Sequence, residues 1–210
     1  MLEIDGSEKS GSGTIVRDAV PFCILTGQEI HLRNIRAKKD KPGLRPQHLK
    51  VLEAAASLCV GMLDGGTVGS REIWFHPVID LLSDEKEAPA FESPSVQAGA
   101  ALAVWLETDT GCLIGADMAG ARGRTAEFIG KQTALNLSAD LGSGATVDTH
   151  LADQVIPFAA LAKGMSTFRI PCMTEHIEAR LWLAEKILGA TYRVRENVVT
   201  IEGIGLINKQ

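Results

Sequence analysis

The spacing of apolar and polar residues divides the chain into alternating helix-like and strand-like segments. Apolar residues three or four positions apart predict helices, whereas alternating or short continuous apolar runs predict strands. In the first part of the chain the predicted elements are a strand at 4–7, a helix at 15–23 that stops at Gly27, a strand at 30–35, a helix at about 46–62, and strands at 67–68 and 73–75. This β-α-β-α-β-β order predicts an α+β or α/β fold in which helices cover one face of a sheet.

A change of composition separates this part from the rest of the chain. Prolines and the charged run at 84–87 predict a linker or surface excursion from about Pro77 to Ser95. Beyond it the predicted elements are strands at 98–107 and 112–116, helices at 125–141 and 150–162, a strand at 167–170, a helix at 176–188, and strands at 191–194 and 198–202. Both parts close with an apolar helix, a glycine, a strand, a polar turn and another strand, which favours a duplicated β-α-β-β unit.

The bulk composition is that of an ordinary soluble globular protein. Of the 210 residues 45% are hydrophobic and 22% charged, which is enough for one sizeable core or two small ones. No uncharged apolar run approaches membrane-spanning length, and the first residues lack the regions of a signal peptide. Four widely spaced cysteines without a Cys-x-x-Cys pair predict a reducing compartment, the cytoplasm, or the nucleus in a eukaryote.

A single basic segment stands out on an otherwise acidic chain. Positions 33–50 carry seven of the 21 Lys and Arg residues and one acid, Asp40, a local charge of +6, whereas the whole chain carries −5. One positive patch on an acidic body is typical of a phosphate-binding site, and the prolines and glycine at 42–46 favour a loop of defined shape. The plainer alternative is a charged, solvated connecting loop.

A predicted helix begins directly after this loop, with Gln47 and His48 in its first turn. Because unpaired N–H groups and the helix dipole attract anions, a basic loop leading into a helix N-terminus predicts an anion site. The glycine- and serine-rich loop at 6–13, followed by Arg17, is a second candidate for phosphate contacts. It fits neither the Walker pattern nor G-x-G-x-x-G, and a plain turn is the alternative.

The run from His150 to Gln154 places donors and acceptors at the start of another predicted helix. His150 and Asp153 share a helix face, and Asp153 and Gln154 are groups of the kind that read a ribose or a base edge. The alternative is a helix start capped by Asp148 and Thr149, with a solvated Asp153.

His176 stands at the start of the last predicted helix, after a short connector. A neutral imidazole at the edge of a basic pocket can act as a nucleophile toward a phosphoryl centre. Glu175 and Glu178 are near enough in sequence to orient or deactivate it. A hypothesis of another class makes His150, Asp153 and His176 a metal site with two histidines and one carboxylate.

Taken together, these runs resemble the RNA 3′-terminal phosphate cyclases. The resemblance covers about 1–76 and 98–202. The matching runs are 4–7, 15–17, 26–27, 35–38, Lys-Pro-Gly-Leu-Arg-Pro-Gln-His-Leu at 41–49, 108–111, 143–145, 147–148 and His-Leu-Ala-Asp-Gln at 150–154.

The resemblance implies an α+β, α/β sandwich-like fold of β-α-β-α-β-β repeats similar to the C-terminal fold of translation initiation factor 3. Family members have three such repeats and a small inserted domain. This chain passes from the first repeat to the last, so we expect two repeats, at 1–76 and 98–210, and a linker at 77–97. The surface left uncovered by the missing repeat predicts a symmetric homodimer.

The resemblance also implies an enzyme of the ligase class, an ATP-dependent RNA 3′-phosphate cyclase. In the family a histidine, here His176, attacks the α-phosphate of ATP and becomes histidine-AMP. The AMP passes to an RNA 3′-phosphate, and the 2′-hydroxyl then displaces it to leave a 2′,3′-cyclic phosphate. The implied ligands are ATP, Mg²⁺ and RNA with a 3′-phosphate end. The implied nucleotide-binding residues are Arg17, Arg36, Lys39, Gln47, His48, His150, Leu151, Ala152, Asp153 and Gln154, and no residue is implied as a metal ligand.

The chain departs from the family pattern at several positions. Ser10 stands where the family's glycine-rich loop carries a glutamate, and Lys39 stands where an arginine is usual. Glu175 and the pair Ala179-Arg180 replace the more neutral residues that usually flank the histidine. The lost loop glutamate and the missing repeat favour an alternative function, a catalytically inactive relative that binds RNA or a ribosome-assembly partner. The retention of His176, Arg17 and Asp153 argues against that alternative.

Overall fold

Three separate sheets organise the chain in the computed structural model, which describes residues 1–78 and 99–206. The elements, in chain order, are β1 (Leu2–Asp5), α1 (Gly13–Thr26), β2 (Ile30–Arg33), α2 (Pro46–Leu58), β3 (Met62–Asp64), β4 (Ile73–His76), β5 (Ala101–Glu107), β6 (Leu113–Ala119), α3 (Ala126–Gly142), α4 (Leu151–Leu161), β7 (Lys163–Arg169), α5 (Glu175–Leu183), η1 (Ala184–Leu188), β8 (Thr191–Arg195) and β9 (Val198–Ile204). The element η1 is a π-helical turn that continues α5. The mixture of helices and sheets confirms the expected α+β class.

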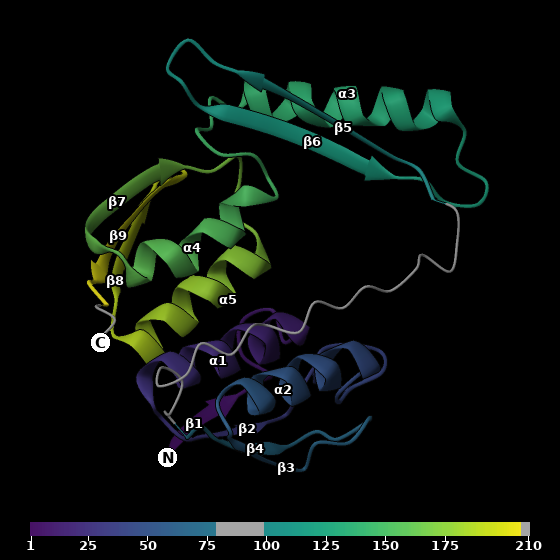
Figure 1. Cartoon of the computed structure of the whole chain (residues 1–210). Coiled ribbons are helices and arrows are strands. Elements are labelled where there is room, and N and C mark those ends of the chain that lie inside the picture. Colours follow the sequence, from purple (N-terminus) through teal and green to yellow (C-terminus); the bar gives the residue numbers. More distant parts are fainter. Residues whose placement is uncertain (79–98, 207–210) are drawn as a thin grey trace.

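The first sheet has the strand order β1-β2-β4-β3. β1 and β2 are parallel, because α1 carries the chain across between them, and the other two pairs are antiparallel. Ile30 and Leu32 are fully buried, whereas Arg33 is exposed, so the strand has one apolar face, which α1 and α2 cover (Figure 1). As predicted, α1 stops at Gly27, whose φ of 68° is a conformation that glycine adopts without strain.

The last sheet is antiparallel, with the order β7-β9-β8, and α4 and α5 lie against one of its faces (Figure 1). Phe168, Val199 and Ile201 are the buried residues of that face. The segment before α4 is tied to the end of β7, since the Thr146 N–H donates to the Arg169 carbonyl at 2.9 Å.

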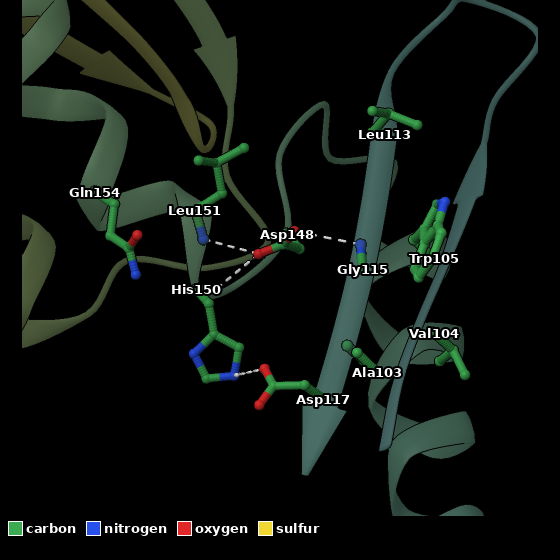
Figure 2. Close-up of a pocket in the computed structure, with 11 residues that line it drawn as sticks. Ala103, Val104, Trp105, Leu113, Gly115, Asp117, Asp148, His150, Leu151 and Gln154 are labelled. Atoms are coloured by element: carbon green, nitrogen blue, oxygen red, sulfur yellow. Dashed lines mark hydrogen bonds and ion pairs between the residues drawn. The ribbon is translucent and has the colours of Figure 1, made fainter. Parts of the chain in front are cut away.

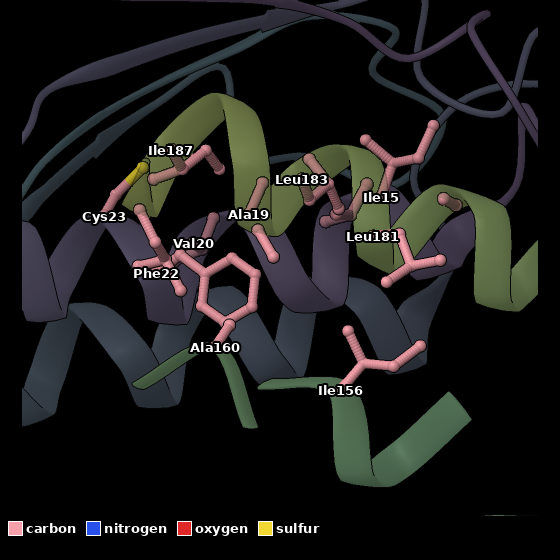
Figure 3. Packing of buried hydrophobic residues seen from close by; sticks show 14 of the residues in the cluster. Ile15, Ala19, Val20, Phe22, Cys23, Ile156, Ala160, Leu181, Leu183 and Ile187 are labelled. Atoms are coloured by element: carbon pink, nitrogen blue, oxygen red, sulfur yellow. The ribbon is translucent and has the colours of Figure 1, made fainter. Parts of the chain in front are cut away.

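Helices from these two sheets pack directly on one another and share one hydrophobic core. α1 contacts α5, and α5 contacts α4, so the helices form the middle layers between the two sheets (Figure 1). Figure 3 shows Ala19 and Phe22 of α1 beside Leu183 of α5 and Ile156 of α4. Because a single buried cluster runs through both sheets, these parts of the chain are expected to unfold together.

The strands β5 and β6 and the helix α3 form a separate element at one side of the molecule (Figure 1). α3 contacts both strands, and Ile114 and Ala116 are buried. The Gly115 N–H donates to the Asp148 carboxylate at 3.3 Å, which links this element to the start of α4. The unit expected at 98–210 therefore contains two sheets.

Two details of the predicted secondary structure are corrected. The helix predicted at 46–62 ends at Leu58, because the backbone at Val60 is left-handed, with a φ of 51°. The strand predicted at 67–68 is a turn, and β3 lies before it, beginning at the last residue that was assigned to the helix. The apolar spacing fits both a helix that continues to residue 62 and a helix that ends at Leu58 before a strand. Only the left-handed backbone at Val60 distinguishes the two.

Most of the expected linker at 77–97 lies outside the described residues. Within the described parts, no helix combines the length and the apolarity needed to cross a bilayer.

Replacing Leu183 with Ala tests the shared core. Leu183 is fully buried between the helical layers, so its truncation should lower the free energy of unfolding by about 2–5 kcal/mol. Urea denaturation followed by Trp fluorescence measures this, and far-UV circular dichroism should give a coincident transition. The matched control is Leu135→Ala on the exposed side of α3, with a change below about 0.5 kcal/mol. Two separated transitions would contradict a shared core.

Candidate active site

The first turns of α1, α2, α4 and α5 meet at one end of the helical layers. The Thr14 hydroxyl, in the first turn of α1, lies 2.7 Å from Nδ1 of His176 in the first turn of α5. The His48 ring, in the first turn of α2, lies so close to Gly13 that a β-carbon there would overlap it. α5 also reaches the first turn of α4 through an ion pair described below. The N-termini of α1, α2 and α5 thus make this end of the molecule suitable for anions, whereas the Asp148 carboxylate already accepts from the first N–H groups of α4.

The glycine- and serine-rich loop closes over the start of α1. Ser12 caps the helix, accepting from the Thr14 N–H at 3.3 Å, and its hydroxyl lies 2.9 Å from that of Ser10. The Lys38 side chain packs over Gly11, whose φ is 52°, and donates to the Lys9 carbonyl at 2.8 Å. The basic segment therefore holds the loop in place. Ser10 is buried and carries no charge.

His48 is a buried, neutral imidazole surrounded by guanidinium groups. Its Nδ1 accepts from the Arg45 N–H at 3.2 Å, so the proton of the neutral ring belongs on Nε2, which faces α1. Burial lowers the pKa of His48, and the positive charges of Arg36, Arg17 and Arg45 lower it further. The structure therefore brings together two of the predicted phosphate ligands, Arg17 and Arg36. Arg45, counted in the basic segment but not assigned to the site, belongs to the same cluster.

The remaining residues of the basic segment differ in how they are held. The Arg36 NH1 donates to the carbonyls of Lys41 at 2.7 Å and Gly43 at 3.2 Å, so part of this guanidinium shapes the loop. Lys39 and Gln47 are exposed, and their side chains contact no partner within the described parts of the chain by hydrogen bond or ion pair.

His176 is exposed at the start of α5, which Thr174 caps by accepting from the Ile177 N–H at 3.2 Å. Thr14 is almost fully buried, so its hydroxyl is a fixed partner for one ring nitrogen. The other nitrogen, Nε2, is left for chemistry. No sequence signal pointed to Thr14, because its contact with His176 spans 162 positions of the chain.

Arg180 joins three helices one turn after His176. Its Nε donates to Asp18 of α1 at 2.9 Å, and its NH1 donates to the Asp153 backbone carbonyl at 2.6 Å and lies 3.6 Å from the Asp153 carboxylate. Burial raises the pKa of Asp18, and the Arg180 charge opposes that rise. Asp153, which the sequence assigned to nucleotide binding, thus contacts Arg180 in the structure.

A cavity of about 560 Å³ lies between the start of α4 and the hairpin of β5 and β6 (Figure 2). Three of the predicted nucleotide-binding residues, His150, Leu151 and Gln154, line it. Ala152 is fully buried in the core, and Asp153 faces Arg180. The structure therefore divides the predicted run between a cavity wall and a helix contact.

The alternative metal site is not supported by the geometry. Across residues 1–78 and 99–206, no group of three or more His, Cys, Asp and Glu side chains is placed to hold a metal. Each member of the proposed set has another neighbour: Asp117 for His150, Arg180 for Asp153 and Thr14 for His176.

The fold and the site define an α+β protein whose clustered guanidinium groups and helix N-termini suit phosphate. The profile of the family described as RNA 3′-terminal phosphate cyclase matches residues 8–117 and 80–194. The chain therefore belongs to the RNA 3′-terminal phosphate cyclase family.

Individual relatives support the same assignment. The RNA 3′-terminal phosphate cyclase of Methanosarcina barkeri is 27% identical over 327 aligned residues, covering 93% of this chain and 97% of the relative. The protein of that name from Pyrobaculum neutrophilum is 22% identical over 343, covering 97% and 99%. That of Methanosarcina acetivorans is 46% identical over 78 residues, which are 37% of this chain and 22% of the relative. Because the first alignment exceeds the 210 residues of this chain, at least a third of its positions face a gap here.

Replacing Arg180 with Gln tests the contact that joins the three helices. Without the guanidinium, two partly buried carboxylates face each other, so the free energy of unfolding should fall by about 3–5 kcal/mol at neutral pH. A folded pKa of Asp18 above its unfolded value contributes stability at acidic pH that is lost as the pH rises through the folded pKa. Removing Arg180 raises that pKa further, so the deficit of the variant should grow from about pH 4 to neutrality.

Urea denaturation over this pH range measures the effect. Adding Asp18→Asn to the Arg180→Gln variant should recover part of the loss at neutral pH. A deficit that is the same at every pH, with no recovery in the double variant, would contradict charge pairing as its cause.

Proposed function

We propose that the protein is an ATP-dependent RNA 3′-phosphate cyclase that works through a histidine-AMP intermediate. The observation that carries this proposal is the Thr14–His176 contact at an end of the molecule where guanidinium groups gather around His48. A nucleophile next to clustered cations and helix N-termini is the arrangement that phosphoryl transfer from a nucleoside triphosphate needs.

The first step is attack of His176 Nε2 on the α-phosphorus of ATP. When Nδ1 carries the ring proton and donates a hydrogen bond to the Thr14 hydroxyl, Nε2 keeps a free lone pair. The N–P bond forms as the bond from the α-phosphorus to the bridging oxygen breaks, and pyrophosphate leaves. Arg17, Arg36 and Arg45 offset the charge that develops on the phosphate oxygens.

The AMP then passes to the RNA. A 3′-phosphate oxygen attacks the adenylate phosphorus, and the imidazole leaves with its electron pair. The adjacent 2′-hydroxyl next attacks the 3′-phosphorus, and AMP departs, which leaves the 2′,3′-cyclic phosphate. Lys39 and Gln47 are exposed beside the basic loop, where they are available to an RNA strand, and His150 and Gln154 contact the nucleoside side.

The chain does not fit a metal held by protein carboxylates. Ser10 replaces the loop glutamate, and the parts of the chain that the structure describes contain no cluster of three or more metal-ligating side chains. Mg²⁺ is therefore proposed only as the counter-ion that arrives with the triphosphate, and no step is assigned to it.

The proposed architecture is a shortened one, with two repeats like the C-terminal fold of initiation factor 3. The β-α-β-α-β-β order of residues 1–76 supports the first. The segment at Thr146, whose N–H donates to the Arg169 carbonyl of β7, followed by α4, β7, α5, β8 and β9, supports the last. The alignment with the relative is longer than this chain, which supports the loss of part of the family's architecture.

A second function is favoured by one observation, the uncharged Ser10 in the loop. In that case the protein binds RNA, or a ribosome-assembly partner, through the same basic surface and performs no chemistry. Its RNA affinity would depend strongly on salt, because phosphate contacts release counterions.

The direct test is incubation with ATP labelled at the α-phosphate. The wild-type protein should acquire an acid-labile adenylate, and His176→Ala should acquire none. Thr14→Val, which keeps the size of the side chain but removes its hydroxyl, should slow adenylation by about 10- to 100-fold with little change in the KM for ATP. A protein that binds RNA in a salt-dependent way and takes no label under any metal or pH condition would be the non-catalytic relative.

The homodimer is tested through the β3 edge of the first sheet. Leu58, Val60 and Met62 are each at least 60% exposed beside this edge strand, a surface suited to a second copy. Light scattering coupled to gel filtration should give the mass of two chains, and Met62→Lys should give the mass of one. A stable wild-type monomer would rule out the homodimer.

A further inference from the structure

The sheet of β7, β9 and β8 has a second face, which points away from the helices. α4 and α5 lie against the face that carries Phe168, Val199 and Ile201 (Figure 1). Because successive side chains of a strand point to opposite sides of a sheet, the residues that alternate with these three form an outer face. The cross-strand pairs arrange that outer face in rows of three residues, one from each strand.

The two rows at the end where β7 stops carry three arginines and no acidic residue. The first row is Arg169, Val198 and Arg195, and the second is Thr167, Thr200 and Arg193. All three arginines are exposed. An acid, Glu202, comes only in the third row, where the Thr191 hydroxyl donates to its carboxylate at 3.4 Å. We call Arg169, Arg193 and Arg195 the arginine face.

The arginine face has no carboxylate partner within the described parts of the chain. There, the arginines that form ion pairs are Arg33 and Arg180. Arg169 NH1 donates instead to the backbone carbonyl of Glu196 at 3.1 Å. The chain has 26 acidic residues against 21 Lys and Arg, so a shortage of acids does not explain this. Unpaired cations gathered on one surface of an acidic protein indicate an anionic ligand.

The residues between the arginines favour a phosphate backbone as that ligand. Neither row contains an aromatic ring on which a base could stack. A membrane surface would require exposed apolar side chains, and the one apolar residue of the two rows, Val198, is partly buried. Guanidinium groups bind phosphate oxygens in pairs, and the hydroxyls of Thr167 and Thr200 add polar contacts. The face is therefore suited to a strand held by its phosphates, without readout of its sequence.

The arginine face ends beside the segment that leads to His176. In the turn between β8 and β9, the Asn197 side chain donates to the Pro171 carbonyl at 3.3 Å, and the Asn197 carbonyl accepts from the Ile170 N–H at 2.9 Å. The chain continues from Pro171 directly into α5, which carries His176 in its first turn. A strand that lies over the arginine face can therefore continue to the end of the molecule where the helix N-termini meet.

We propose that the arginine face binds the backbone of an RNA strand upstream of its 3′ end, independently of base sequence. The placement of the 3′ end at His176 rests on the proposed cyclase function, but the binding of the backbone does not. A long RNA should reach both the arginine face and the candidate active site, whereas a very short one should reach only the latter.

The test is fluorescence anisotropy with labelled RNA of about 4 and about 20 nucleotides, each with a 3′-phosphate, over a series of salt concentrations. The double variant Arg193→Gln/Arg195→Gln should bind the long RNA more weakly. Its plot of log K against log salt should be shallower by about 1.4, because each phosphate contact with a single strand contributes about 0.7 to the slope. The slope for the short RNA should not change.

Two further variants isolate the role of these charges. Arg193→Lys/Arg195→Lys keeps both charges and should keep the wild-type slope. Arg122→Gln/Lys131→Gln makes the same change in net charge at exposed positions of the element that contains α3, and it should also leave the slope unchanged. Thermal unfolding of each variant checks that the fold is intact.

The outcomes separate this proposal from the cyclase function. Equal slopes for wild type and Arg193→Gln/Arg195→Gln on the long RNA overturn it, as does an equal loss for the short RNA. Displacement of no RNA but capture of polyglutamate by the wild-type protein also overturns it. Adenylation from labelled ATP should be the same in wild type and Arg193→Gln/Arg195→Gln. If wild type takes no adenylate but its RNA binding depends on these arginines, the cyclase function fails and the arginine face stands.

Discussion

The structure depends on bringing four helix N-termini to one place. Each carries the positive end of a helix dipole, and the basic segment adds guanidinium groups beside α1 and α2. Only at α4 does a carboxylate, that of Asp148, already accept from the first N–H groups. Such a concentration of positive charge is unfavourable in the empty protein. Asp18 and Asp153 relieve it on one side through Arg180. On the side of His48 the described residues supply no such carboxylate contact, so the positive charge there is left to attract an anion.

Arg180 explains how the arrangement stays fixed. A buried ion pair adds little net stability compared with apolar packing, but it is demanding in geometry. Here one guanidinium spans Asp18 on α1 and Asp153 on α4, and it does so one turn from His176. The register between α1 and α5 that these contacts impose is the same register that sets Thr14 against His176. The charges of the helix interface therefore decide where the His176 ring lies.

Local pattern was sufficient to predict most elements, because the apolar spacing of α1, α3 and α4 is regular and Gly27 marks a helix end. The local pattern failed where a single backbone angle decides whether a helix continues. The left-handed conformation of Val60 ends α2, so the apolar residues that follow form strand β3 and not a further helical turn. The local pattern also gave no sign that β5 and β6 form a sheet of their own, since strand partners are set by tertiary packing rather than by alternation.

The candidate site shows the same division. The basic loop, His48 and His176 carry sequence signals, because their chemistry is unusual for their surroundings. Thr14 carries none, and Arg180 stood out only as a departure from the family pattern, since a threonine and an arginine in helices are ordinary until folding places them against residues 162 positions away. The sequence assigned Asp153 to nucleotide binding, and the structure shows that its carboxylate also lies near the Arg180 guanidinium.

The hairpin of β5 and β6 shows why the charge pattern matters beyond the phosphate site. A two-stranded sheet is marginal alone, and here α3 covers one face while the Asp148 bond to Gly115 ties the other face to α4. The Asp148 carboxylate therefore makes two kinds of contact. It accepts from the N–H groups at the start of α4, and it accepts from the N–H of Gly115, the β6 residue that pairs with Trp105. Because that anion cancels the attraction of the helix end for phosphate, the molecule has a cationic region near the starts of α1 and α2 and an acidic cavity between the start of α4 and the hairpin.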